Sequence, residues 1–177
     1  MFRRFLPEQV VRSVFDIDLE ALRARGVRGI ITDLDNTLAG ARTPAAPPEV
    51  AEWLNRVRKG GFRIVIVSNN RRSRVSAFAE PLGIPFIYSA RKPLTRSFRQ
   101  ALGLMELSAR EAAVVGDQLL TDVLGGRRLG LHTILVSPIA PREEGWATKI
   151  NRRFERWVRS RLLKKGLWPD EERWRDG

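Results

Sequence analysis

The chain has 177 residues, enough for one domain with a sizeable buried core and too few for two independent catalytic domains. Its 32 lysines and arginines outnumber its 20 aspartates and glutamates, and the net charge of +12 favours a polyanionic partner: a nucleic acid, an anionic lipid or a phosphorylated substrate. No cysteine is present, which excludes disulfides, thiolate metal sites and cysteine nucleophiles and agrees with a reducing, cytoplasmic location.

Residues 1–27 are expected to form an extension that packs on a core domain. The basic start is followed by Pro7, Glu8 and Gln9, which interrupt the apolar stretch that a secretion signal requires. The apolar residues between positions 5 and 15 are expected to cover a sheet or to share in a surface contact. Uninterrupted apolar runs such as 64–67 are far shorter than the roughly 18 to 20 residues of a transmembrane helix.

Residues 28–146 alternate short β-branched runs with segments of helical spacing, as expected for a core domain. The expected strands are 29–33, 63–68, 85–89, 112–116 and 132–136, and the expected helices are 48–59, 71–82, 94–102 and 119–129. This alternation predicts an α/β fold: a three-layer sandwich in which helices flank a mainly parallel five-stranded sheet. The connections 38–47 and 68–92 leave no room for an inserted domain, so no large cap domain is expected.

Residues 147–177 are expected to form a basic amphipathic helix followed by a tail. Between 149 and 165 there are eight basic residues and one acidic residue. Apolar residues recur among these cations with near-helical spacing, at Phe154, Trp157, Val158, Leu162 and Leu163, and Trp168 and Trp174 follow. The helix is expected to lie on an anionic membrane surface or to pack on its own domain. Nucleic-acid binding ranks last, because no recognised RNA-binding motif accompanies the charge.

Polar residues follow the predicted strands where each strand ends, and in an open α/β sheet this edge forms the ligand crevice. The set is Asp33-Leu-Asp-Asn-Thr37, Ser68-Asn69-Asn70, Lys92-Pro93, Gly116-Asp117 and Asp122. Carboxylates are hard oxygen ligands, so a cluster of them suits Mg²⁺ better than zinc or copper. Asp33 and Asp35 point to the same face of a strand, so one can attack a phosphorus while the other moves a proton.

This set of residues fits phosphoester hydrolysis in two displacements. A metal ion and Lys92 would neutralise the transferring phosphoryl oxygens, and Ser68 could donate a further hydrogen bond. Backbone amides after Asp33 would complete a phosphate cradle, for which Leu34, Thr37 and Asn69 are also candidates. The alternative for each residue is structural, because turn acids, helix caps and a solvated surface lysine use the same residue types.

In their order and spacing these segments resemble the four motifs of the haloacid dehalogenase (HAD) superfamily. The resemblance implies that Asp33 is the nucleophile, Asp35 the general acid/base, and Ser68 and Lys92 the groups that position the phosphate. The metal ligands that it implies for Mg²⁺ are the side chains of Asp33, Asp117 and Asp122 and the backbone carbonyl of Asp35. An acid/base carboxylate at position 35 implies phosphoryl transfer rather than dehalogenation, and the missing cap implies the capless class III.

A narrower resemblance covers nearly the whole chain. The segments that carry it are Leu6-Pro7, Ile31-Thr-Asp-Leu-Asp-Asn-Thr-Leu38, Ser68-Asn-Asn70, Gly116-Asp-Gln-Leu-Leu-Thr-Asp122-Val-Leu-Gly-Gly126 and Thr148-Lys-Ile-Asn-Arg152. They resemble the YqeG family of HAD-IIIA proteins, which is similar to phosphatidylglycerophosphate phosphatases.

The resemblance implies a magnesium-dependent phosphomonoester hydrolase that acts on an anionic phospholipid, phosphatidylglycerophosphate, from the inner face of the membrane. One alternative is a phosphatase for a soluble sugar phosphate, nucleotide or phosphoprotein. Another, of a different class, is an RNA- or ribosome-binding protein on the same fold. The sequence leaves the oligomeric state open.

Overall fold

The computed structural model describes residues 2–140 and 146–169. Residues 1, 141–145 and 170–177 lie outside the described part of the chain, and so does Trp174, one of the two tryptophans that follow the predicted C-terminal helix. The predicted division of the chain at residues 28 and 147 remains a prediction.

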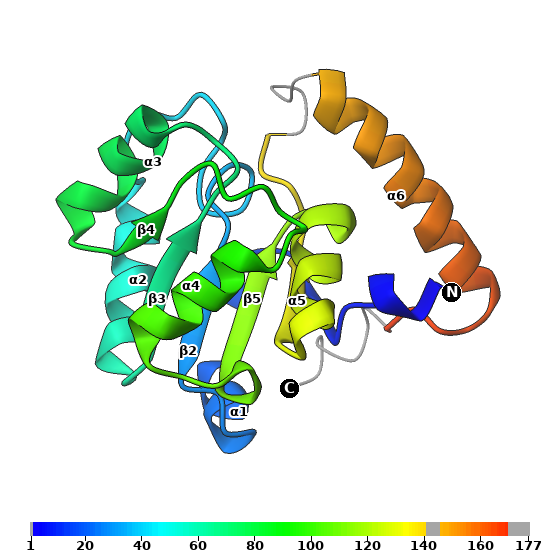
Figure 1. Cartoon of the computed structure of the whole chain (residues 1–177), viewed down its shortest axis with the longest axis horizontal. Helices are drawn as coiled ribbons and strands as arrows, with labels where there is room; N and C mark the ends of the chain where they lie inside the picture. The colour runs from blue at the N-terminus through cyan, green and yellow to red at the C-terminus, as the bar shows by residue number, and fades with distance from the viewer. Residues whose placement is uncertain (1, 141–145, 170–177) are drawn as a thin grey trace.

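One parallel sheet runs through the molecule (Figure 1). Its strands are β1 (Gln9–Val11), β2 (Gly29–Thr32), β3 (Arg63–Val67), β4 (Phe86–Ile87), β5 (Ala112–Gly116) and β6 (His132–Val136), in the order β1-β6-β5-β2-β3-β4. The predicted α/β class and parallel sheet are confirmed, but the predicted number of strands was one too low. The additional strand is β1, whose three residues are too few to show a strand pattern and whose partner β6 lies far along the chain.

The helices follow the predicted order with shifted ends. They are α1 (Leu19–Ala24), α2 (Pro48–Lys59), α3 (Arg72–Ala79), α4 (Arg96–Met105), α5 (Leu124–Leu129) and α6 (Trp146–Lys164). Short helical turns are η1 (Phe2–Phe5), η2 (Val14–Asp16), η3 (Glu80–Leu82), η4 (Ala109–Glu111) and η5 (Leu119–Val123), of which η5 is a π-helix. Within the described residues, only loops, α3 and η3 lie between β2 and α2 and between β3 and β4, so there is no large cap domain, as predicted.

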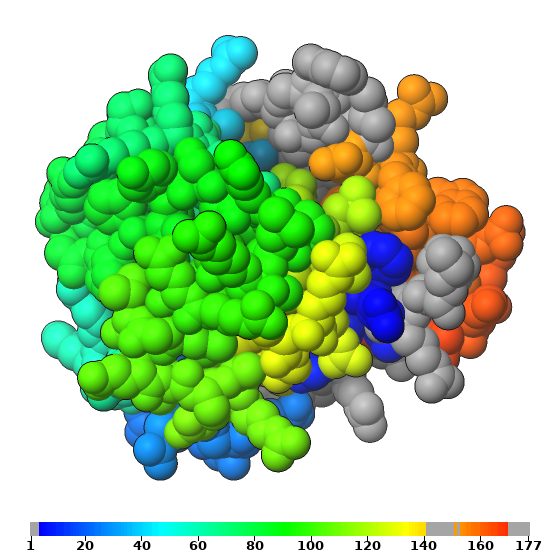
Figure 2. All heavy atoms as spheres, viewed as in Figure 1, coloured from blue at the N-terminus to red at the C-terminus, as the bar shows by residue number. Residues whose placement is uncertain are grey.

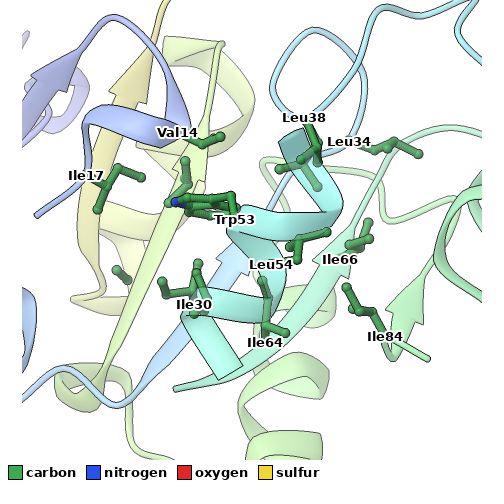
Figure 3. Close-up of a cluster of buried hydrophobic side chains, with 14 of the residues drawn as sticks. Val14, Ile17, Ile30, Leu34, Leu38, Trp53, Leu54, Ile64, Ile66 and Ile84 are labelled. Atoms are coloured by element: carbon green, nitrogen blue, oxygen red, sulfur yellow. The ribbon is translucent and has the colours of Figure 1, made fainter. Parts of the chain in front are cut away.

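Two apolar layers cover the two faces of the sheet. Apolar residues of α2 and α3 pack against one face, and those of α4 pack against the other. In Figure 3, Trp53 of α2 lies in the first layer among Val14, Ile17 and Ile30, and in Figure 1 α4 lies in front of the sheet. Val65, Val114 and their neighbours are buried because both faces are covered, which explains the continuous apolar runs in the sequence.

The C-terminal helix α6 packs against the N-terminal segment at the β1 side of the sheet. Figure 2 shows α6 in orange beside N-terminal residues in blue. Val158 and Leu162 are fully buried there together with Trp168, whereas Phe154 and Trp157 remain 41% and 45% exposed. The apolar positions of α6 therefore divide between one set that contacts the domain and another that faces solvent. No helix in the described parts of the chain combines the length and apolarity needed to cross a bilayer.

Candidate active site

Five of the predicted site residues meet at the carboxyl edge of the sheet. Asp33 follows β2, Ser68 follows β3, Lys92 lies in the loop after β4, Asp117 follows β5, and Asp122 lies on η5. The strands hold this arrangement, because Asp33 N donates to the carbonyl of Val115 at 2.9 Å and Ser68 N donates to that of Ile87 at 2.9 Å. Parallel pairing thus brings together residues that are far apart in sequence.

Three buried carboxylates and one ammonium form the centre of the site. Asp33, Asp117 and Asp122 each offer an oxygen within 4.8 Å of the others. Lys92 Nζ lies 2.6 Å from Asp33 Oδ1 and 2.7 Å from Asp122 Oδ1. Together the three carboxylates outweigh the one ammonium, and their oxygens are the ligands that a hard divalent cation prefers. The residues therefore fit Mg²⁺, which Asp33, Asp117 and Asp122 would hold.

Burial and charge set the protonation of this centre. Burial raises the pKa of Asp33 to about 6; the Lys92 ammonium opposes that rise and the Asp122 carboxylate adds to it. Burial by itself would lower the pKa of Lys92, but the carboxylates of Asp122 and Asp33 outweigh it and raise that pKa above the ordinary lysine range. Lys92 thus remains a cation and can neutralise charge on a transferred phosphoryl group.

Hydrogen bonds to neighbouring residues fix these side chains in place. The Asn69 side chain binds the backbone of Lys92, accepting from its N–H at 2.7 Å and donating to its carbonyl at 3.4 Å. Asp122 Oδ2 accepts from the backbone N–H of Gln118 at 3.2 Å. Thr37 Oγ1 donates to Asp117 Oδ1 at 3.4 Å. Asn69 and Thr37, both predicted to bind phosphate, therefore contact other residues of the site.

Asp35 lies outside the group of three carboxylates and has partners of its own. Its Oδ2 accepts from Asn70 Nδ2 at 2.8 Å, and its Oδ1 accepts from Arg74 Nε at 3.1 Å and lies 3.0 Å from Arg74 Nη2. Arg74 also donates to the carbonyl of Gly40 at 3.2 Å. Sequence reasoning missed Arg74; its position two residues into a helix that follows Asn70 was the available signal. Asn70 and Arg74 together bind both oxygens of the Asp35 carboxylate.

The remaining predicted residues lie in the same loops. Ser68 is buried, and its hydroxyl accepts from the backbone N–H of Asn70 at 3.1 Å. The Leu34 side chain belongs to the apolar core, so only the backbone of Leu34 can face a phosphate.

This arrangement provides a nucleophile, a cation and a proton-transfer group around one edge. Asp33 can attack a phosphorus while Lys92 binds the phosphoryl oxygens, and a divalent cation in this site would supply further positive charge. The separately held Asp35 carboxylate can exchange a proton with the leaving oxygen. Two carboxylates in unlike surroundings are suited to two different roles.

Comparison with known proteins identifies the relatives of this chain. A HAD-hydrolase-like family model matches residues 89–138, which include Lys92, Asp117 and Asp122. Over 162 residues the chain is 51% identical to the probable phosphatase YqeG of Bacillus subtilis, an alignment that covers 92% of this chain and 94% of that protein. It is 28% identical over 173 residues to phosphatidylglycerophosphate phosphatase 1 of Arabidopsis thaliana, covering 93% of this chain and 50% of the relative.

Solved structures share the fold at low sequence identity. The cobalt-bound deoxy-D-mannose-octulosonate 8-phosphate phosphatase of Haemophilus influenzae matches with a TM-score of 0.52 and 15% identity, over 65% of this chain and 70% of that chain. CbbY of Rhodobacter sphaeroides in complex with phosphate also matches with a TM-score of 0.52 and 15% identity, over 68% of this chain and 91% of that one. These similarities support the fold alone.

Proposed function

Because the chain belongs to the YqeG family of HAD-like phosphatases, we propose that it hydrolyses phosphomonoesters through a phospho-aspartate on Asp33, and that its substrate is phosphatidylglycerophosphate. The observation that carries the chemical part is the contact of Lys92 with both Asp33 and Asp122 inside a buried group of three carboxylates. A bound Mg²⁺ would supply further positive charge for the transferring phosphoryl oxygens.

The residues have separate roles in the formation and the hydrolysis of the phospho-aspartate. Asp33 forms a bond to phosphorus as the ester P–O bond breaks, and Asp35 gives a proton to the leaving oxygen. Water then attacks the phosphorus of the acyl phosphate, Asp35 takes a proton from it, and phosphate leaves Asp33 free. Lys92 binds phosphoryl oxygens throughout, and Ser68 and the backbone after Asp33 provide the other contacts.

Two relatives support the proposed lipid substrate. Besides the Arabidopsis protein, phosphatidylglycerophosphate phosphatase 1 of Chlamydomonas reinhardtii is 28% identical over 176 residues, which cover 93% of this chain and 64% of that protein. The chain thus spans about half to two thirds of these relatives. The capless fold agrees with a bulky substrate, because no domain covers the catalytic edge within the described residues.

Contact with an anionic membrane surface would bring the enzyme to such a lipid. The net charge of +12 and the exposed aromatic residues Phe154 and Trp157 on a basic helix support this contact. The expected location is the cytoplasmic face of a membrane.

The test is release of phosphate from phosphatidylglycerophosphate in mixed micelles, with and without Mg²⁺, beside a panel of soluble phosphate esters. We expect Mg²⁺-dependent turnover of the lipid that the Asp33→Asn variant lacks. Turnover of soluble esters alone would replace the lipid with a soluble substrate. No turnover, together with salt-sensitive RNA binding, would favour the binding-protein alternative.

A further inference from the structure

A small cavity lies beside the group of three carboxylates, between α6 and the edge of the sheet. It has a volume of about 230 Å³, and its wall includes Asp117, Leu119, Glu155, Arg156, Arg159 and Trp168. Asp117 also belongs to the group of three carboxylates, so the cavity adjoins the catalytic site. A pocket for a whole drug-sized ligand has roughly 300–1,000 Å³, so this one suits a single group of a larger substrate.

The acidic groups of the wall already have other contacts. Asp117 accepts from Thr37 and faces the other two carboxylates. Glu155 is only 6% exposed and accepts from the backbone N–H of Leu120 at 3.1 Å. The acids of the cavity are therefore engaged with the protein, and Glu155 also anchors α6 to the π-helix that carries Asp122.

Two arginines supply the positive charge of the wall. Arg156 and Arg159 are exposed on α6. The guanidinium of Arg159 lies 5.1 Å from the ring centre of Trp168, which restrains it against one wall. Trp168 is 8% exposed and lines the cavity as a large aromatic surface. The two guanidinium groups favour a ligand that carries negative charge and accepts hydrogen bonds.

We propose that this cavity is a second anion subsite, in which Arg156 and Arg159 bind the phosphodiester of a substrate whose terminal phosphate is attacked by Asp33. The inference rests on the proposed function, since phosphatidylglycerophosphate carries both groups, separated by one glycerol. Because Asp117 belongs both to the cavity wall and to the group of three carboxylates, the two phosphates would lie at adjoining sites, as that short separation requires. The subsite selects substrates with two phosphates over those with one.

The experiment compares two soluble esters, so that membrane binding has no part in it. One is glycerophosphoglycerol phosphate, the deacylated headgroup, and the other is glycerol phosphate, which has the phosphomonoester alone. In the full-length Arg156→Gln/Arg159→Gln variant, we expect kcat/KM for the headgroup to fall roughly tenfold or more, since hydrogen bonds between charged groups are lost. The value for glycerol phosphate should stay within about twofold of the parent protein.

The matched control is the Arg153→Gln/Arg161→Gln variant. It removes the same charge from the same helix but from residues outside the cavity wall, and it likewise breaks one arginine–tryptophan contact, that of Arg161 with Trp157 at 5.2 Å. We expect it to leave the preference between the two esters unchanged. Glycerophosphoglycerol has the phosphodiester but no scissile phosphate, so it should inhibit the parent and the control variant competitively. It should inhibit the Arg156→Gln/Arg159→Gln variant roughly tenfold more weakly.

Three results would overturn the subsite. If the Arg156→Gln/Arg159→Gln variant hydrolyses both esters more slowly by the same factor, the two arginines support the fold or the general charge and do not select between substrates. If the control pair reproduces the loss, long-range attraction is responsible. A parent protein that hydrolyses glycerol phosphate but not the headgroup would overturn the lipid substrate as well, while the phosphatase assignment would stand.

Discussion

Asp33 and Asp35 are separated by one residue, yet they have different surroundings. Asp33 is buried against Lys92 and lies close to two other carboxylates, whereas Asp35 is 21% exposed at its side chain and is bound by Asn70 and Arg74. Hydrogen bonds from two side chains restrict the carboxylate to one orientation, which matters for a group that must reach a leaving oxygen. Arg74 is therefore expected to position Asp35.

Replacing Arg74 with Gln should harm proton transfer more than phosphoryl binding. A leaving alkoxide needs a proton from Asp35, whereas p-nitrophenolate leaves readily without one. We expect kcat/KM to fall roughly 10- to 100-fold for an alkyl phosphate and by less than about threefold for p-nitrophenyl phosphate. This ratio reports the formation of the phospho-aspartate and not its later hydrolysis, in which Asp35 also takes part. Arg72→Gln, on the same helix and near Tyr88, is the control and should change neither. Equal losses on both esters would instead indicate a general structural role for Arg74.

The raised pKa of Asp33 predicts how stability depends on pH in metal-free protein. Folding disfavours the ionised carboxylate, so native protein holds this proton longer than unfolded protein, and stability falls as pH rises from the ordinary value of 3.8 to about 6. Asp33→Asn removes this loss and should be more stable than the parent above pH 6, by on the order of 1–3 kcal/mol. Urea unfolding in EDTA at pH 4 and pH 7.5 measures the difference in the free energy of unfolding between the variant and the parent. A difference that is the same at both pH values would contradict the raised pKa of Asp33.

At the scale of elements, the turn from β5 into η5 positions two of the three carboxylates. Asp117 follows β5 directly, and Asp122 folds back over Gly116 from the π-helix. A Cβ at position 116 would overlap the Asp122 side chain, so this glycine is needed for the close approach. The π-helix is a feature often found at functional sites, and here it carries a proposed metal ligand.

Gly116→Ala is expected to displace Asp122 and weaken cation binding. Mg²⁺ at 100 times its Kd should stabilise the parent by about 2.7 kcal/mol, or several degrees in Tm, and the variant should lose most of this increase. Gly103→Ala is the control, because an added Cβ meets no atom within 4 Å in helix α4. It should keep the full response to Mg²⁺. Thermal unfolding with and without Mg²⁺ gives the result, and an unchanged response in Gly116→Ala would contradict the proposed role of Asp122.

For the whole molecule, the two faces of α6 have different roles. Val158 and Leu162 pack on the domain, so the exposed Phe154 and Trp157 are not needed to attach the helix. The Phe154 ring lies 5.7 Å from that of Trp157 and 6.2 Å from that of Phe5, so residues from both ends of the chain form one aromatic cluster. Arg161 lies over Trp157, which combines the apolar rings with positive charge.

Removing this cluster should weaken membrane binding without unfolding the protein. We expect the Phe154→Ala/Trp157→Ala variant to bind phosphatidylglycerol vesicles roughly tenfold more weakly than the parent, because partly exposed aromatic area is lost from the contact. Leu104→Ala, an exposed apolar residue on α4, is the control and should bind normally. Vesicle co-sedimentation provides the measurement. Equal binding by all three proteins would show that the aromatic cluster does not take part in membrane contact.

The sequence by itself determined the fold class and the group of residues at the catalytic edge. Buried parallel strands need continuous β-branched runs, and their carboxyl ends share one edge, so Asp33, Ser68, Lys92 and Asp117 could be placed together from local patterns alone. The order and spacing of these residues also indicated the family, which the comparisons confirm.

Only the tertiary structure decided which residues support that edge. Strand β1 exists because β6 offers it a partner, and the contacts of Arg74 with Asp35 and of Asn69 with Lys92 join separate loops. The sequence of α6 could not show which apolar side chains would be covered, because its periodicity gives a stripe but not the surface opposite it. Local patterns specify elements, whereas pairing and burial depend on partners that are distant along the chain.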